Sequence, residues 1–308
     1  MSLCPLDRKR ADQLKHHAAI ASISLALLLS FLKLFAALAS GSLAVLSSMI
    51  DSLSDVLGSG ITFIAIRYSM RPASDLHRYG YGKAEAVSAL IQAVFIAGSG
   101  LYVIYDAVIR FLSPRALDET PLAIAIMLFS LLATLVLIAY QKHIATLTNS
   151  QAIRADSAHY VVDILTNLSI ILSLTIVKFW EIYWFDTLTA FLIAAYLLFN
   201  AYNLAKDSFK VLLDHELDES IRQHIQQLIA QHSFVKGFHD IRTRSSGNDY
   251  MIEIHLELDG RLSLYEAHQL SDQVENVIIK AYPNAQVIIH QDPAGIVEKR
   301  LDNKLAGN

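Results

Sequence analysis

The chain has 308 residues, of which 54% are hydrophobic and 18% are charged. This composition is too apolar for an ordinary soluble domain and is typical of a protein that crosses a membrane several times. The formal net charge of -4 gives no indication of a nucleic-acid partner. The single cysteine, Cys4, excludes a disulfide framework or a thiolate metal site within one chain.

Apolar stretches dominate the first two thirds of the chain. The first follows a basic segment, which also fits a cleaved signal peptide, but its apolar core of roughly 20 residues exceeds the usual 7–15. Six stretches are each predicted to span a lipid bilayer, since about 20 residues at about 1.5 Å per residue cover about 30 Å. They run approximately over residues 18–38, 43–66, 84–109, 121–140, 152–177 and 186–204.

Basic residues concentrate in the N-terminal arm and in the links that follow the second and fourth stretches. The positive-inside rule therefore predicts a multi-pass protein with both termini in the cytoplasm. The residues that carry this prediction are Arg8, Lys9, Arg10, Lys15, Arg67, Arg71, Arg78, Lys83, Lys142 and Arg154.

Ionisable residues interrupt two of the apolar stretches. Asp51 and Asp55 lie four residues apart in the second stretch, so they share one face of a helix. A carboxylate at the centre of a bilayer costs at least about 2.5 kcal/mol, which makes the pair a candidate functional site. His159 and Asp163 have the same spacing in the fifth stretch. Counted from opposite edges of a core about 30 Å thick, both pairs lie about 14–15 Å deep, so they can meet.

Three carboxylates and one imidazole at one depth predict a site for a divalent cation or for protons. Four nitrogen and oxygen ligands in a tetrahedron suit Zn2+, and they also accept Fe2+, Co2+ or Cd2+. Metal and protons compete for the same lone pairs because bound ligands must be deprotonated, which favours metal/proton exchange. The alternative is a hydrogen-bond cluster that only fastens two helices, and the cost of intramembrane carboxylates disfavours it.

After about residue 214 the sequence becomes polar. Its patterns predict a helix over 215–232, strands over 237–244 and 249–258, a helix over 263–282 and a strand over 285–292. Ser263 and Glu266 form a capping box at the start of the second helix. The order α-β-β-α-β predicts a small, open-faced, ferredoxin-like sandwich. We therefore expect an α-helical membrane domain over 1–213, an α/β domain over 214–292, and a flexible tail over 293–308.

Several segments together resemble the cation diffusion facilitator family, in particular its bacterial ferrous-iron/zinc efflux (FieF-type) branch. They are DSLSD, GYGKAEA, SQAIRADSAHYVVD, HDIRTRSSG, EIHLEL and IIHQDP, and the resemblance covers nearly the whole chain. It implies a homodimer of six-helix bundles with cytoplasmic metallochaperone-like domains in the bacterial inner membrane. Such a protein is not an enzyme; it exports divalent metal in exchange for protons. The resemblance implies the transport site that depth and spacing also select: Asp51, Asp55, His159 and Asp163.

Most histidines of the polar region, taken singly, fit solvated side chains on a polar strand face. The resemblance changes this interpretation, because the family has a two-metal site at the cytoplasmic dimer interface. The matching positions here are His239, His255, His268, His290, Gln291 and Asp292.

The link after the second stretch departs from the family pattern, which has an aspartate and two histidines as a surface metal site. His77 is present, but Ser74 replaces the aspartate and Tyr81 replaces the second histidine, with Asp75 as a neighbouring substitute. We expect this site to be weak or absent, since one histidine and one carboxylate are too few ligands.

Lys83 and Asp214 match a pair that the family uses as a charge interlock holding the dimer. The alternative is two unrelated surface charges, whose pairing would contribute at most about 1 kcal/mol.

Other functions fit less well. An intramembrane aspartyl protease also needs aspartates on two helices, but its G-x-G-D signature is missing. The sequence has neither the H-E-x-x-H motif of a metalloprotease nor the Walker loop of an ATP-driven pump. A membrane-anchored metal sensor is a further alternative, and it would bind metal without producing flux.

Overall fold

The computed structural model describes residues 8–40, 43–112, 121–180, 184–247, 249–296 and 300–306. The chain forms two compact units, one over Lys9–Phe209 and one mainly over Lys210–Asn308. Each unit has its own hydrophobic core.

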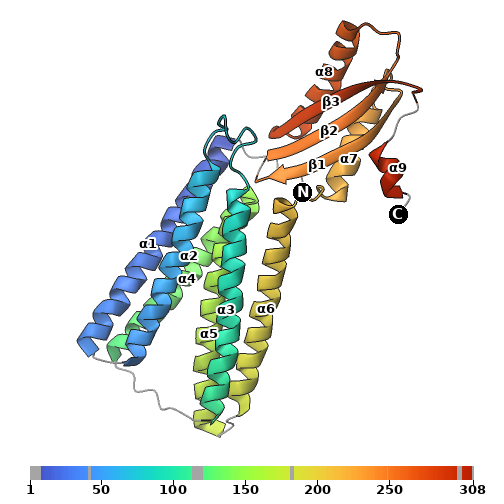
Figure 1. Cartoon of the computed structure of the whole chain (residues 1–308). Helices are drawn as coiled ribbons and strands as arrows, with labels where there is room; N and C mark the ends of the chain where they lie inside the picture. Colours follow the sequence, from blue (N-terminus) through green and yellow to red (C-terminus); the bar gives the residue numbers. More distant parts are fainter. Residues whose placement is uncertain are drawn as a thin grey trace. The chain divides into compact units, whose positions relative to one another are not determined.

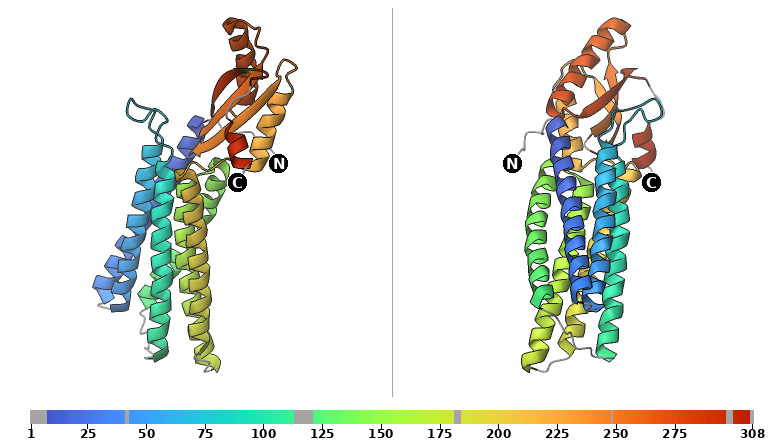
Figure 2. Two further views of the ribbon diagram at one scale, coloured as in Figure 1. Left: turned by 45° about the vertical axis from the view of Figure 1, so that its right-hand side comes forward. Right: turned by 90° about the vertical axis from the view of Figure 1, so that its left-hand side faces the viewer.

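Long helices build the first unit, and they run side by side (Figures 1 and 2). Each predicted apolar stretch lies within one of them, so the prediction of a long helix at each stretch is confirmed. The helices are α1 (Arg8–Ser40), α2 (Leu43–Ser69), α3 (Ala84–Leu112), α4 (Pro121–Thr148), α5 (Gln151–Trp180) and α6 (Trp184–Leu212).

Four of these helices have described segments that are long and apolar enough to cross a membrane. The segments are Lys9–Phe35, Ala84–Tyr105, Leu128–Thr148 and Leu188–Leu212. Within the described residues, α2 and α5 are not among them; these two helices carry the carboxylates and the histidine of the candidate membrane site.

Helix α5 packs against α2, α3 and α4. Small residues line part of this packing: a buried cluster combines Ala18, Ala145 and Ala152 with Ile66 and Ile153. Small side chains at helix interfaces let backbones approach closely, which is typical of membrane helices. The close packing brings polar side chains of several helices into the interior of the bundle.

The second unit is a three-stranded sheet with helices on one face. Its elements follow the predicted order α-β-β-α-β, and strand β2 lies between β1 and β3, antiparallel to β1 and parallel to β3 (Figure 1). The elements are α7 (Glu219–Ala230), β1 (Gly237–Ser246), β2 (Asp249–Leu258), α8 (Leu264–Ala281), β3 (Ala285–Pro293) and α9 (Leu301–Ala306). The capping box of Ser263 and Glu266 is present as predicted, and its hydrogen bonds from Ser263 lower the pKa of Glu266.

Alternation along β2 assigns the two faces of the sheet, because successive side chains of a strand point to opposite sides. Ile252, Ile254 and Leu256 belong to the buried core, together with Ile225 of α7 and Ile278 of α8. The intervening positions of β2 therefore lie on the side of the sheet away from α7 and α8, which we call the open face.

The C-terminal segment differs from the flexible tail expected over 293–308. Residues 301–306 form helix α9, which contacts β1 (Figure 1). The carboxylate of Asp240 accepts hydrogen bonds from the backbone N–H groups of Leu301, at 2.7 Å, and Asp302, at 2.9 Å. These bonds satisfy two N–H groups that a helix start leaves unpaired. A polar segment can thus be ordered without an apolar face of its own.

Candidate metal sites

The first candidate site lies between α2 and α5. Nε2 of His159 is 3.2 Å from Oδ1 of Asp55. Asp55, His159 and Asp163 each offer one ligand atom, and these atoms lie within 4.8 Å of one another. At about 1.5 Å per residue, the histidine lies about 12 Å along α5 from the beginning of that helix. Two helices are thus needed to complete the site.

The site is largely shielded from solvent, and its donor set suits a cation. The side chain of His159 is 7% exposed and that of Asp55 is 18% exposed. Nδ1 of His159 is buried and has no hydrogen-bond partner among the described residues. A buried ring nitrogen without a partner loses hydration unless it binds something, which supports a ligand role for this imidazole.

Asp51, the fourth predicted ligand, belongs to α2, one turn before Asp55. Its side chain lies outside the part of the chain that the structure describes. Its position on the same helix face rests on the spacing of four residues alone.

A fully buried carboxylate, Asp156, lies on α5 three residues before the histidine. It accepts hydrogen bonds from Ser22 of α1 at 2.5 Å, Ser59 of α2 at 3.2 Å and Gln141 of α4 at 2.6 Å. The hydroxyls of Ser59 and Tyr160 are 2.8 Å apart. We call Ser22, Ser59, Gln141, Asp156 and Tyr160 the serine–aspartate cluster; it connects four helices beside the candidate metal site. The sequence pattern alone did not predict this cluster, although Asp156, the carboxylate that the motif RADSAHYVVD contains besides Asp163, was a usable signal.

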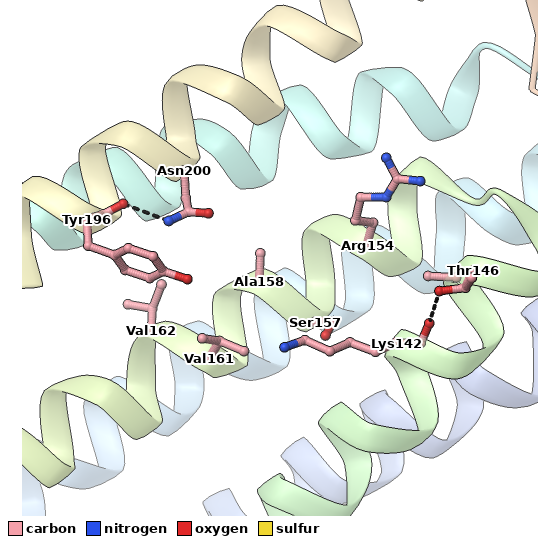
Figure 3. A pocket seen from close by; sticks show the side chains of 10 residues that line it. Lys142, Thr146, Arg154, Ser157, Ala158, Val161, Val162, Tyr196 and Asn200 are labelled. Atoms are coloured by element: carbon pink, nitrogen blue, oxygen red, sulfur yellow. Dashed lines mark hydrogen bonds between the residues drawn. The ribbon is translucent and has the colours of Figure 1, made fainter.

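A cavity of about 320 Å³ lies among α4, α5 and α6 and is lined by Lys142 and Arg154, among others (Figure 3). Its lining residues on α5 include Ala158 and Val161. Its lining residues do not include Asp55, His159 or Asp163. The cavity is therefore separate from the site between α2 and α5.

The second candidate site lies on the open face of the sheet. His239, His255 and His290 occupy one row across β1, β2 and β3, because the register pairs the first with the second and the second with the third. His239, His255 and Asp292 offer ligand atoms within 4.8 Å of one another.

Asp292 connects the histidines of this site. Its Oδ2 is 2.9 Å from Nδ1 of His255 and 3.7 Å from Nε2 of His239, whereas its Oδ1 is 3.3 Å from Nε2 of His290. Each carboxylate oxygen thus faces a different part of the row. Such a carboxylate can bind one ion or bridge two ions, and nitrogen with oxygen ligands suits zinc and similar divalent metals.

Two predicted members of this site, Gln291 and His268, lie apart from the row of histidines within one chain. Gln291 alternates with His290 and Asp292 along β3 and pairs in register with the core residue Leu256, so its side chain belongs to the face covered by the helices. His268 lies on α8, where it is 3.6 Å from Asp272, one helical turn away. Strand and helix periodicity therefore separate both residues from the row of histidines within this unit.

His77 lies in the exposed link between α2 and α3. Its ring stacks on Tyr81 with centroids 4.5 Å apart, and its backbone exchanges hydrogen bonds with Ser74. No cluster of three possible metal ligands in the described ranges includes His77. The weak or absent metal site at His77 stays a prediction.

The predicted charge interlock joins residues of two different units. Asp214 is 3.3 Å from Arg244 within its own unit, and Lys83 precedes α3 in the other. The pairing of Lys83 with Asp214 stays a prediction.

Glu257 is a further polar residue of this site that was not predicted from the sequence. Its Oε1 is 3.1 Å from Nδ1 of His239 and 2.5 Å from Nη2 of Arg300. The usable signal was its position on the polar face of β2, two residues after His255.

Comparisons with known proteins identify the family of the chain. Residues 19–213 match the family of the cation efflux transmembrane domain, and residues 217–294 match the cytoplasmic domain of cation efflux proteins. The chain belongs to the cation efflux family. The resemblance to the cation diffusion facilitators is thereby confirmed. The protein is a membrane protein for cation efflux, as predicted, and not an enzyme.

Curated relatives match over nearly their full length. The cation-efflux pump FieF of Shewanella oneidensis MR-1 is 42% identical over 280 residues, which cover 91% of this chain and 94% of the relative. The cation-efflux pump FieF of Escherichia coli O127:H6 is 37% identical over 287 residues, covering 93% and 95%. Among solved structures, the metal-bound C-terminal domain of the CzcD transporter from Thermotoga maritima is 28% identical. It matches with a TM-score of 0.25 and covers 27% of this chain and all of that domain.

Proposed function

We propose that the protein exports a divalent metal ion across the bacterial inner membrane in exchange for protons, with both termini in the cytoplasm. The observation that carries this proposal is the convergence of Asp55, His159 and Asp163, from two helices, within 4.8 Å. Ionisable residues inside a membrane segment mark ion or proton pathways in most cases. Membership of the family supports efflux, and the ligand set of this site supports a divalent metal ion as the cargo.

The transport cycle follows from the ligand set. In the inward-facing state, a hydrated metal ion reaches the site, loses water and displaces protons from His159 and the aspartates. Relative movement of the helices then opens the site to the outside. Protons from outside compete for the same lone pairs, and the metal leaves. The three carboxylates and the imidazole therefore alternate between a metal-bound state and a protonated state. In neither state does the membrane hold charged carboxylates without a metal or protons.

The donor set defines the class of cargo. Three carboxylates, with Asp51 included by its spacing, and one imidazole accept Zn2+, Fe2+, Co2+ and Cd2+. We propose Zn2+ as the principal cargo, because tetrahedral sites of nitrogen and oxygen ligands suit it.

The open face of the sheet is proposed as a second, cytoplasmic metal site in a homodimer. His239, His255, His290 and Asp292 supply ligands from three adjacent strands.

A flux assay in proteoliposomes tests the proposal. Purified protein is reconstituted, a pH gradient is imposed, and uptake is measured for zinc, ferrous iron, cadmium, cobalt and manganese. We expect zinc uptake that requires the gradient and is lost in His159→Ala. His17→Ala changes an exposed histidine of α1 and serves as the matched control. Metal binding without any flux would instead support the sensor alternative and overturn the exchanger.

A further inference from the structure

The C-terminal helix is joined to the strand that carries His239. The carboxylate of Asp302 accepts a hydrogen bond from the backbone N–H of Asp240 at 2.9 Å, while the Asp240 carboxylate accepts two from the start of α9. The two aspartates thus fix β1 and α9 to each other reciprocally. A contact of this kind fixes orientation as well as distance, because several hydrogen bonds must keep their directions at once.

The backbone beside His239 is irregular. The pairing of β1 with β2 shifts register between His239 and Arg242, and Asp240 has a positive φ of 48°. Residues other than glycine adopt this left-handed region rarely, although aspartate tolerates it better than most. Such a conformation persists where surrounding contacts hold it. Here the hydrogen bonds between Asp240 and the start of α9 are contacts of this kind. The bulge sets the direction in which the His239 side chain leaves the strand.

A second connection reaches the imidazole itself. Arg300, directly before α9, donates a hydrogen bond to Oε1 of Glu257 at 2.5 Å, and the same oxygen is 3.1 Å from Nδ1 of His239. Gly237 leaves the space that Glu257 needs, since a Cβ atom at this position would lie 2.8 Å from its Oε2. The side chain of Glu257 is 15% exposed and that of His239 is 5% exposed, so water competes little for these bonds.

This arrangement determines which nitrogen of His239 can bind metal. The Glu257 carboxylate can only accept a hydrogen bond, so Nδ1 of His239 carries the proton and donates it, which leaves the lone pair on Nε2. Nε2 is the nitrogen that faces Asp292, at 3.7 Å from its Oδ2. Metal-binding histidines commonly donate their other ring N–H to a carboxylate, which fixes both tautomer and ring orientation.

We propose that Arg300 and helix α9 are positioning elements of the cytoplasmic metal site. Arg300 holds Glu257, which orients the His239 ring, and the reciprocal contact of Asp240 with α9 holds the strand bulge. The C-terminal segment therefore tunes the metal affinity of the open face without binding metal. This inference rests on the proposed cytoplasmic site.

The test uses the full chain in detergent with His159→Ala as the common background, which removes a ligand of the membrane site. Zinc affinity is measured by competition with a chelator for Arg300→Ala, Arg300→Lys and a chain that ends after residue 296. We expect affinity to fall by about 10–100-fold in Arg300→Ala and in the shortened chain, as is typical when a partner of a metal ligand is lost. Arg300→Lys keeps the cation and restores part of the affinity. Lys304→Ala, an exposed change on α9 itself, is the matched control and leaves it unchanged.

A second readout separates positioning from general stability. Nitrogen-15 NMR of the histidine rings in the metal-free protein reports the tautomer directly. We expect His239 to carry its proton on Nδ1 in the parent and to become a mixture of tautomers in Arg300→Ala, with unchanged thermal unfolding.

His255→Ala distinguishes the two ways in which the proposal can fail. Parent-like affinity in Arg300→Ala, combined with lost affinity in His255→Ala, overturns the positioning role alone. Parent-like affinity in both variants overturns the cytoplasmic site and this proposal with it.

Discussion

Nε2 of His159 on α5 lies 3.2 Å from Oδ1 of Asp55 on α2, in the interior of the helical unit. A site divided between two helices responds to their relative movement, because each helix carries only part of the ligand set. Closing and opening such a site does not require either helix to unfold. This geometry suits a transporter in which packed helices rock against each other.

Asp55→Asn is the most direct test of the membrane site, because it keeps the shape of the side chain and removes its charge. We expect metal flux to fall by more than about 100-fold, since losing even an outer hydrogen-bond partner of a ligand costs about 10–100-fold. The measurement is zinc uptake into proteoliposomes with a fixed pH gradient.

The control for this experiment is Asp75→Asn, which makes the same chemical change in the exposed link between α2 and α3. Both variants should unfold at the parent temperature. Flux in Asp55→Asn equal to that of the parent would show that the aspartate is not a ligand of the transported ion.

Periodicity alone was sufficient to group Asp55, His159 and Asp163. Helical spacing fixed which residues share a face, and the thickness of a bilayer fixed their depth. The serine–aspartate cluster could not be predicted in this way. Asp156 meets Ser22 and Gln141 only because α1 and α4 pack beside α5, and nothing in a single helix encodes that packing.

In the α/β unit, too, local periodicity predicted some features, whereas others depend on contacts between distant segments. Alternation along β2 predicted the core face and the polar face correctly, since strand periodicity is a local property. The same rule, applied to β3, places the side chains of Gln291 and His290 on opposite faces of the sheet. Helix α9 was missed because its order depends on Asp240, which lies about 60 residues earlier in the chain and in a bulge that interrupts the alternation.

Asp156→Ala should destabilise the helical unit. The substitution removes the acceptor that Ser22, Ser59 and Gln141 share. The two serine hydroxyls stay 2.9 Å apart and can bond each other, whereas the buried amide of Gln141 loses the acceptor that the structure gives it. An unsatisfied buried group costs about 1–3 kcal/mol, which is the loss of stability expected here. Thermal unfolding in detergent measures it, with Asp156→Asn as a milder variant that keeps one acceptor oxygen. A parent-like unfolding temperature in Asp156→Ala would refute a structural role for the cluster.

Acidification should weaken metal binding at the membrane site. Protons compete with the metal for the imidazole and carboxylate lone pairs, so apparent affinity falls about tenfold per pH unit for each proton displaced. Zinc affinity measured at several pH values, in the shortened chain that lacks residues after 296 and carries His255→Ala, isolates this site. An affinity independent of pH would contradict proton exchange at Asp55 and His159.

The two faces of β3 should respond differently to substitution. His290→Ala removes a side chain of the open face, where its ring lies 4.7 Å from that of His255. Gln291→Ala changes a side chain of the opposite face. We expect zinc affinity of the cytoplasmic site to fall in His290→Ala and to stay at the parent value in Gln291→Ala, measured by chelator competition. The reverse result would show that β3 presents its other face to the metal.

Titration of Asp240 reports whether α9 is docked. Burial raises the pKa of Asp240, but hydrogen bonds from the backbone N–H groups of Leu301 and Asp302 and the nearby charges of His239 and His255 lower it, with a net lowering. Because the folded pKa lies below the unfolded value of about 3.9, the stability contributed by ionised Asp240 is fully present above about pH 3.9. It is lost as the pH falls through the lower folded pKa.

Carbon-13 NMR of aspartate carboxyl groups, assigned with Asp240→Asn, should show this group titrating below the ordinary range in the parent. Removal of the residues after 296 should return the pKa toward its ordinary value, because the two N–H donors are gone. An Asp240 signal that titrates identically with and without α9 would show that the helix does not dock on β1 in solution.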